Sequence, residues 1–509
     1  MKQQIYRRCV FFVIGLMMGF GSPLEAQNAL LQRGDEMFSA YDYKQAIVFY
    51  QKAFGRGGSP YYLTRRMGDA YRMLRQWDDA ELWYRRALSH PNVPNEVYMQ
   101  LGEVLCAKGD IVEGHELLAQ FYRLSGFTMA GIAADYRSYI DVLSCDSARC
   151  ELLNMPMNGL DDEVAPFVCS GGLYFSSNRA VIHPVNRKDV RNGQSFFDIY
   201  VYRLAGRDSG HVVAPPAGFN SPYNDGPVWM SDRLDVAYIT RNRANSQGII
   251  SVLDVMELSI DEKGQVAGSQ FLPFGDDDWT VAHACLSSDG RRLFFSAQLP
   301  GGKGGLDLYM SEFRNGFWGR PLNLGEGVNT AANECFPFLT ADGLLFFSSN
   351  GWPGLGGYDL FYSVERSGGF EMSFNLGVPL NSACDDTGLF LFPDMKNGFL
   401  TSNRPGGQGG DDIYRVSLLR PLIYTRLQGQ VIDVDGQPVG SALVTVVMPD
   451  GREFNRLSTT VNGEFLCFLP PGHYRLCVRK HLFEALESEV VARELWRNEI
   501  ELTLKMNLK

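Results

Sequence analysis

Beyond its first 26 residues this chain lacks long apolar segments. No later stretch approaches the roughly eighteen consecutive apolar residues that a membrane-spanning helix needs, so we expect nothing after residue 26 to cross a membrane. An excess of basic residues is also missing, since 47 Lys and Arg stand against 58 Asp and Glu and the net charge is −11. Because nucleic-acid binding depends on phosphate neutralisation, we expect no nucleic-acid partner.

Signatures of catalysis and metal binding are scarce as well. The chain contains no Gly-x-Ser-x-Gly nucleophile elbow. Its seven histidines, among them His90, His115 and His283, do not show the spacing of metal ligands, and we interpret them as surface or core residues. We therefore predict no catalytic, cofactor-binding or metal-binding residues, no cofactor and no enzymatic activity.

Cysteine is limited to ten residues, and Cys9 lies ahead of the N-terminal apolar run, away from any cleavage point, so we expect no lipid attachment. In an oxidising compartment Cys145 could pair with Cys150 across a short loop, and Cys467 with Cys477 across an intervening turn. The alternative is that most of the cysteines are small buried hydrophobes.

The N-terminus has the pattern of a secretory signal. Basic residues at positions 2, 7 and 8 precede an apolar run over 10–20, and residues 24–26 offer a cleavage site. We predict that residues 1–26 are a signal peptide and that the mature chain is exported. The alternative is that the segment stays uncut as an anchor.

Residues 27–143 carry a repeat with a period of 34 residues. The recurring positions are Gly34, Gly68 and Gly102; Ala46, Ala80 and Gly114; Tyr50, Tyr84 and Leu118; and Ala53, Ala87 and Phe121. The small residues let two antiparallel helices approach closely, and the larger ones interlock neighbouring hairpins. We predict an α-solenoid of three tetratricopeptide repeats, closed by a capping helix within 126–143.

Residues 144–420 hold a longer repeat, seen as an acidic residue followed by a short strand. The five copies are Asp198-Ile199-Tyr200, Asp254-Val255-Met256, Asp307-Leu308-Tyr309, Asp359-Leu360-Phe361 and Asp412-Ile413-Tyr414. Their spacings of 56, 53, 52 and 53 residues match one four-stranded propeller blade with its loops, although the second copy is degenerate. We predict a β-propeller of PD40 or WD40-like type.

The fourth copy shows the expected order of strands. Residues 336–339 form the innermost strand, 344–349 the second and 358–362 the third. The Gly-rich loop between the second and third strands is expected where the backbone turns sharply, a conformation that glycine adopts at little cost. An outer fourth strand is expected at 317–325 and at 370–377.

The outer-strand pattern occurs once too early and is missing once at the end. Residues 150–156 carry a shortened version ahead of the first copy, whereas none follows 415–419. We predict that the early segment pairs with the strand at 412–417, which closes the ring and removes two exposed sheet edges. This pairing favours five blades over six.

Two features of the blades invite a chemical interpretation. Residues 406–411 match the Gly-Gly-x-Gly-x-Asp core of calcium-binding β-rolls, but those sites need tandem repeats, so we favour a glycine hairpin. Asp198, Asp307, Asp359 and Asp412 could line a channel as the carboxylates of a glycoside hydrolase. Because they recur at equivalent positions, we favour a structural role in which each one bonds a loop.

Residues 425–509 form a third unit. The segment from Gly429 to Val439 has the pattern strand, turn, strand, and apolar alternation continues past turns at 449–451 and 470–472. The last strand is expected at 498–504. About 80 residues suffice for a small β-sandwich.

The order of a signal, tetratricopeptide repeats, a propeller with Ser-Asn-Arg, Gly-Gly and Asp-Ile-Tyr motifs, and a sandwich resembles the OmpA-family envelope proteins of Bacteroidetes-type bacteria, including the Por-type component of the type IX secretion system. The propeller motifs also resemble TolB-like PD40 repeats, and the sandwich resembles the carboxypeptidase-regulatory-like domain. Family members usually continue into an OmpA-like domain that grips peptidoglycan, whereas this chain stops at Lys509 on the sandwich. Peptidoglycan binding is therefore not expected from this chain alone, and the lipid anchor of some relatives is missing.

The resemblance implies a non-enzymatic scaffold in the periplasm. It would associate with the outer membrane through protein partners in the cell envelope, in a type IX-like secretion or envelope complex. All three folds commonly serve binding. The alternative is a glycan-binding or glycan-processing propeller protein, which would need unrepeated carboxylates within glycosidase distance of one another.

Overall fold

The structure is a computed structural model. It describes residues 23–39, 42–56, 61–125, 136–144, 148–179, 188, 193–205, 209–231, 233–244, 250–275, 279–341, 343–366, 369–419, 422, 425–451, 453–469, 471–493 and 499–509. Residues 1–22, most of the predicted signal peptide, lie outside the described residues. The chain divides into two compact units, Met1–Leu117 with Lys188–Gln194 and Leu118–Arg187 with Ser195–Lys509. Within the described residues, no helix combines the length and the apolar character needed to span a membrane.

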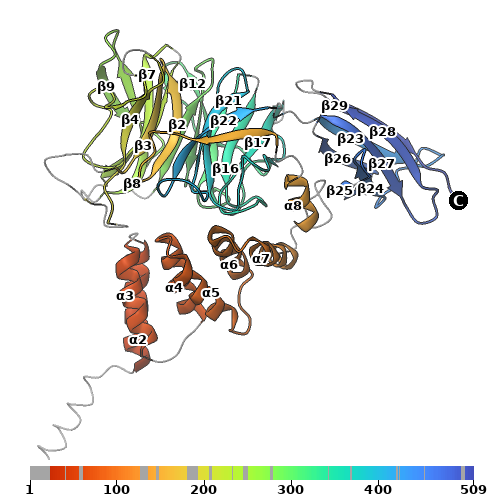
Figure 1. The fold of residues 1–509 in the computed structure, drawn as a ribbon, viewed down its shortest axis with the longest axis horizontal. Coiled ribbons are helices and arrows are strands. Elements are labelled where there is room, and N and C mark those ends of the chain that lie inside the picture. The colour runs from red at the N-terminus through yellow and green to blue at the C-terminus, as the bar shows by residue number, and fades with distance from the viewer. Residues whose placement is uncertain are drawn as a thin grey trace, which may run out of the picture. The chain divides into compact units, whose positions relative to one another are not determined.

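The N-terminal region is helical (Figure 1). Its described helices are α2 (Pro23–Ser39), α3 (Tyr43–Phe54), α4 (Tyr61–Met73), α5 (Trp77–Leu88), α6 (Glu96–Lys108) and α7 (Ile111–Leu124). Helix ends follow local rules. The Asp42 carboxylate accepts the Gln45 N–H at 3.1 Å and caps the start of α3, and Gly109, at φ 95°, ends α6 in the left-handed conformation.

Small residues bring the helices of a pair together, as their spacing predicts. A Cβ atom on Gly34 would lie 2.4 Å from the Tyr50 ring, and one on Gly68 would lie 2.7 Å from the Tyr84 ring. The same polar contact also recurs after 34 residues, because the Tyr50 hydroxyl donates to Asp35 at 2.7 Å and the Tyr84 hydroxyl to Asp69 at 2.8 Å. The predicted close packing at these glycines is therefore confirmed.

Helix α8 (Tyr136–Ser144) belongs to the second unit. It overlaps the predicted capping helix, of which residues 126–135 lie outside the described residues. The Tyr136 hydroxyl donates to the carbonyl of Gly354 at 2.6 Å, and the Tyr139 hydroxyl donates to that of Pro353 at 3.1 Å. These bonds attach α8 to the β-rich part of its own unit.

The rest of the second unit begins with five antiparallel sheets, called the first to the fifth sheet here. The first sheet contains β2 (Glu163–Cys169), β3 (Gly172–Ser177), β4 (Asp198–Arg203) and β5 (Val212–Val213). The second sheet contains β6 (Asp225–Met230), β7 (Val236–Ala244), β8 (Ile250–Ile260) and β9 (Val266–Phe271). The third sheet contains β10 (Val281–Leu286), β11 (Arg292–Ala297), β12 (Asp307–Arg314), β13 (Phe317–Trp318) and β14 (Leu322–Asn323).

The fourth sheet contains β15 (Glu334–Leu339), β16 (Leu344–Ser349), β17 (Asp359–Arg366), β18 (Gly369–Phe370) and β19 (Phe374–Asn375). The fifth sheet contains β20 (Asp386–Leu391), β21 (Asn397–Ser402), β22 (Asp412–Leu418) and, from far upstream, β1 (Cys150–Asn154). The outer strand is thus shorter than predicted in the third and fourth sheets, where it is split into two pieces. In the third sheet Pro321 lies between the pieces, and proline has no N–H to continue a ladder.

The first strands of the five sheets contact one another in a closed circle. Strand β2 contacts β6 and β20, β10 contacts β6 and β15, and β15 contacts β20. A buried apolar cluster lies between each pair of adjoining sheets, including the first and the fifth. Successive side chains serve opposite clusters, as Phe346 packs toward the fifth sheet and Phe347 toward the third. The second strands are therefore buried on both faces, which explains their continuous apolar runs.

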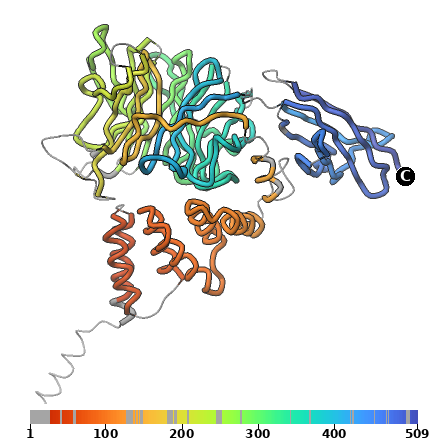
Figure 2. Tube along the Cα trace, viewed as in Figure 1, coloured from red at the N-terminus to blue at the C-terminus, as the bar shows by residue number. Residues whose placement is uncertain are grey.

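Strand β1 completes the fifth sheet. It pairs antiparallel with β22, in a register that sets Cys150 opposite Leu418 and Asn154 opposite Tyr414. The trace in Figure 2 lets the reader follow the chain from β1 through the first four sheets to β22. The predicted pairing of the early segment with the last copy is confirmed.

The C-terminal part is a β-sandwich. It contains β23 (Thr425–Ile432), β24 (Leu443–Val447), β25 (Glu453–Ser458), β26 (Glu464–Leu469), β27 (Gly472–Arg479), β28 (Leu486–Ala492) and β29 (Glu499–Lys505). One sheet has the order β26-β23-β29 and the other β25-β24-β27-β28, around a shared apolar core. The strand expected to end at Val439 is reduced to one bridge between Ile432 and Pro438, since proline cannot donate to a ladder.

The proposed bridge between Cys467 and Cys477 is not formed. Both thiols are free, and they lie in different sheets of the sandwich. Cys467 is buried in the core, whereas the Cys477 thiol contacts Glu487 at 3.8 Å. The other proposed pair, Cys145 with Cys150, involves Cys145, which lies outside the described residues.

Candidate functional site

One end of the five sheets is built from a repeated set of polar contacts, which we call seams. In each of four seams, the first residue of a first strand donates its N–H to a carbonyl just before the third strand of the preceding sheet. The four bonds run from Glu163 to Asp411 at 2.7 Å, from Asp225 to Phe197 at 2.8 Å, from Glu334 to Leu306 at 2.7 Å and from Asp386 to Tyr358 at 2.6 Å. The seams therefore join neighbouring sheets through backbone hydrogen bonds.

The Gly-rich loops make these seams possible by leaving room for the neighbouring backbone. A Cβ atom on Gly304 would lie 2.2 Å from the Ala332 carbonyl oxygen, one on Gly356 would lie 2.4 Å from the Ala383 carbonyl carbon, and one on Gly409 would lie 1.9 Å from the Asp161 carbonyl oxygen. None of these three glycines has a positive φ. The backbone bends at these positions, as predicted for the Gly-rich loop of the fourth copy, but glycine is required there for close approach and not for a left-handed conformation.

The aspartates that start the third strands bind their own loops. Asp307 accepts the N–H groups of Lys303 at 2.6 Å and Gly304 at 3.0 Å, and Asp412 accepts that of Gly409 at 3.3 Å. Asp359 likewise accepts the Leu355 N–H. All of these carboxylates are buried, as is that of Asp198. The structural role that we favoured is confirmed for Asp307, Asp359 and Asp412.

A second set of carboxylates starts the first strands, and three of them are paired with arginine. Glu163 is paired with Arg179 at 2.8 Å, Asp225 with Arg241, and Asp386 with Arg404. Each acid is fully buried. Burial raises the pKa values of Glu163, Asp225 and Asp386, and the paired arginines offset part of that rise.

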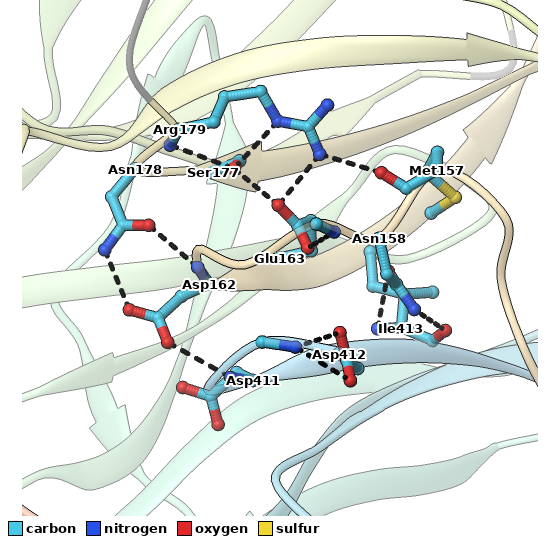
Figure 3. Close-up of polar contacts among 12 residues, drawn as sticks. Met157, Asn158, Asp162, Glu163, Ser177, Asn178, Arg179, Asp411, Asp412 and Ile413 are labelled. Atoms are coloured by element: carbon cyan, nitrogen blue, oxygen red, sulfur yellow. Dashed lines mark hydrogen bonds and ion pairs between the residues drawn. The ribbon is translucent and has the colours of Figure 1, made fainter. Parts of the chain in front are cut away.

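Figure 3 shows the seam at which the ring of contacts closes. The Arg179 guanidinium bonds both the Glu163 carboxylate and the Met157 carbonyl, at 2.8 and 3.0 Å. The Asp162 carboxylate accepts the N–H of Asp411 at 3.1 Å and the Asn178 amide at 2.8 Å. This network links residues before the first sheet to residues at the end of the fifth.

An asparagine clamps the third strand in four of the sheets. The Asn158 amide accepts the N–H of Ile413 at 3.1 Å and donates to the carbonyl of the same residue at 2.8 Å. The same pair of bonds recurs between Asn220 and Ile199, Asn329 and Leu308, and Asn381 and Leu360. Asn158 differs from the others because 255 residues separate it from its partner.

The second sheet departs from the loop-binding aspartates, and the third sheet departs from the acids that start the first strands. In the second, Asp254 has no Gly-rich loop and is paired with Arg243 at 3.0 Å. Burial raises the pKa of Asp254 to about 6, and Arg243 opposes the rise. In the third, the acid is replaced by Val281, which lies in an apolar cluster with stacked Phe274 and Phe295 rings. The degeneracy of the second copy thus has a structural counterpart.

The first strands meet through bulges and aromatic rings. Each carries a β-bulge at the same place, with a positive φ at Ala165, Gly226, His283, Phe336 or Gly388. Farther along the strands, Phe167 contacts Trp229 and Phe390, with ring centroids 5.8 and 5.6 Å apart, and Phe338 contacts Phe390 at 5.4 Å. Burial lowers the pKa of His283 to about 3, so this core histidine is neutral.

These contacts define what the arrangement can do chemically. The repeated carboxylates accept hydrogen bonds from amides, hydroxyls and guanidinium groups and hold the loops in fixed positions, although the Oδ1 atom of Asp359 has no hydrogen-bond partner among the described residues. No three His, Cys, Asp or Glu side chains gather as a potential metal site in the part of the chain that the structure describes. The first-strand acids were missed in the sequence, although their spacing to the Ser-Asn-Arg motif could have indicated them.

The sandwich belongs to a recognisable class of domain. Its two sheets and their shared core are those of a small all-β module. Residues 426–505, which span β23 to β29, match the family model of the carboxypeptidase regulatory-like domain. No curated protein matches the chain.

Among solved structures, the chain has partial likenesses at low identity. It is 13% identical to 3-chlorocatechol 1,2-dioxygenase from Rhodococcus opacus 1CP, over 17% of this chain and 60% of that one, with a TM-score of 0.15. It is also 13% identical to catechol 1,2-dioxygenase from Pseudomonas arvilla C-1, over 17% of this chain and 52% of that one, with a TM-score of 0.14. It is 14% identical to endo-arabinase from Bacteroides thetaiotaomicron VPI-5482, over 52% of this chain and 96% of that one, with a TM-score of 0.34. The chain thus spans less than two thirds of either dioxygenase.

Proposed function

We propose that this protein is a non-enzymatic scaffold of the periplasm, held at the outer membrane by protein partners in a type IX-like secretion or envelope complex. In this proposal the helical region is a tetratricopeptide solenoid and the five sheets are the blades of a β-propeller. The period of 34 residues supports the solenoid. The closed circle of contacts between first strands supports the propeller.

The observation that carries the non-enzymatic proposal is the burial of the repeated carboxylates. A glycoside hydrolase needs two carboxyl groups that reach the scissile bond, with a separation set by its mechanism. Here Asp307, Asp359 and Asp412 are at most 1% exposed and bind the amides of their own loops. Such groups stabilise loops rather than transfer protons, and fixed loops on a rigid framework are suited to binding.

The helical region offers a face for a peptide partner. The first helices of the three pairs are joined side by side, because Arg66 of α4 bonds Asp35 of α2 at 3.2 Å and Arg72 of α4 bonds Glu103 of α6 at 2.8 Å. Tyr62 of α4 donates to Asp35 and is still 38% exposed. We expect this face to take an extended or helical segment of a protein partner.

Affinity purification from envelope extracts tests the proposal. The tagged full chain should retain partners that a variant without residues 27–124 loses, while the β-rich part still melts cooperatively. Tyr62→Ala should weaken retention, whereas Leu82→Ala, which truncates an exposed residue of α5, serves as the matched control. Recovery of the chain alone, together with hydrolysis of a glycoside substrate, would replace the scaffold with a glycan-processing protein.

A further inference from the structure

The seam between the third and fourth sheets contains a buried carboxylate that forms no ion pair with the residues that the structure describes. Glu334 starts β15 and is fully buried, like Glu163, Asp225 and Asp386 in their strands. Each of the other three is paired with an arginine of its own sheet. Glu334 instead accepts the Thr330 and Ser349 hydroxyls, both at 2.7 Å, and the Thr330 N–H at 2.9 Å.

The missing arginine has a local cause. The motif Ser177-Asn178-Arg179 of the first sheet corresponds to Ser349-Asn350-Gly351 in the fourth. A Cβ atom on Gly351 would lie 1.8 Å from the Thr330 hydroxyl oxygen. Thr330 therefore leaves no room for a side chain at position 351. In the arginine-paired seam of the fifth sheet, Ser382 makes the same bonds to Asp386 and Arg404 adds a positive charge, which Glu334 lacks.

We propose that the seam between the third and fourth sheets is a pH-sensitive joint, which tightens when Glu334 takes up a proton and loosens when Glu334 loses it. The segment that carries Glu334 also makes the seam. Its backbone bonds the third sheet through Glu334 N–H to Leu306 and through Gly305 N–H to Ala332, both at 2.7 Å. A charge buried at Glu334 therefore acts on the atoms that join the two sheets.

The surroundings of Glu334 favour its protonated form. Burial raises its pKa to about 7, the hydrogen bonds from Thr330 and Ser349 oppose the rise, and Asp307 of the third sheet adds to it. Lys303 lies in the Gly-rich loop before β12 of the third sheet, and its ammonium group is paired with Glu326 at 2.7 Å. On β15 itself the neighbouring Cys335 is a buried thiol, whose pKa is raised by burial first and then by Glu334 and Asp385.

The sign of the pH effect follows from this shift. The pKa of Glu334 is higher in the folded chain than its ordinary value of 4.5, so its stabilising contribution is complete below about pH 4.5. The contribution is lost as the pH rises through about 7. The seam should therefore be tightest in acid and weaker above neutral pH.

Hydrogen exchange of the full chain at pH 5.5 and pH 8 tests the joint, after correction for intrinsic exchange rates. We expect protection of the Gly305 and Glu334 amides to fall about tenfold or more at the higher pH. The Asp386 amide, in an arginine-paired seam, is the internal control and should change much less. In Glu334→Gln the pH dependence at the first two amides should vanish.

An infrared measurement follows the protonation of carboxyl groups in the wild-type chain directly. The band of protonated carboxyl groups in the wild-type chain should lose a component near pH 7 that is absent from Glu334→Gln. If that component were already lost below pH 5, or if Glu334→Gln kept the wild-type pH dependence of exchange, the proposal would be wrong. Glu163→Gln should retain the component near pH 7, because its own carboxyl group is paired with Arg179.

Discussion

Replacing Asn158 by alanine tests whether the segment before the first sheet stabilises the fifth. The side chain of Asn158 is buried and holds both the N–H and the carbonyl of Ile413. Alanine would leave the Ile413 N–H unpaired in the interior, whereas the Ile413 carbonyl would keep its bond from the Met155 N–H at 3.0 Å. A buried group without a partner costs about 1–3 kcal/mol. We expect a loss of about 1–3 kcal/mol, which for a unit of this size lowers Tm by roughly 2–12 °C.

The matched control is Asn381→Ala. Asn381 makes the same two bonds to Leu360, at 2.7 and 2.9 Å, but across a short stretch of chain. Calorimetry and circular dichroism of both variants should give similar losses in the transition of the β-rich part. A normal Tm for Asn158→Ala beside a lowered Tm for Asn381→Ala would refute the closure of the fifth sheet. Normal values for both would refute the energy assigned to the clamp.

Three further outcomes can be measured with the same assays. Deletion of 144–158 should abolish the cooperative transition of the β-rich part, because it removes β1 and exposes the edge of β22; an unchanged Tm would contradict this. Gly409→Ala should cost about 2 kcal/mol or more, since its Cβ would lie 1.9 Å from the Asp161 carbonyl oxygen, whereas Gly268→Ala, with open space around it, should be close to neutral. Melting curves with and without a chelator should superimpose, because the loop carboxylates bind amides; a large calcium-dependent rise in Tm would show that a native-state ligand was overlooked.

Strand positions and the closing pair could be predicted because their signals are local or can be counted. The second strand of the fourth copy was expected at 344–349, where β16 lies, since apolar runs between turn residues mark buried strands. The closing pair followed from one surplus outer strand and one missing strand. Both inferences need only the order of patterns along the chain.

The polar seams could not be predicted in the same way because they depend on contacts between sheets. The residue that starts the first strand differs between sheets, being Glu163 in the first and Val281 in the third, so no single motif marks this position. Glycine poses a similar difficulty. A glycine needed for a positive φ and a glycine needed for close approach have the same letter, and only the neighbouring backbone, such as Ala332 beside Gly304, distinguishes them.

The pairing of β1 with β22 has a consequence for the order in which the chain folds. Helical pairs close loops of a few tens of residues and are expected to form early, whereas β1 must wait for a partner that is made more than two hundred residues later. During that interval β1 is an unpaired strand whose apolar residues, such as Leu152, can join other chains. A factor that shields unfolded chains would therefore matter most before β22 has been made.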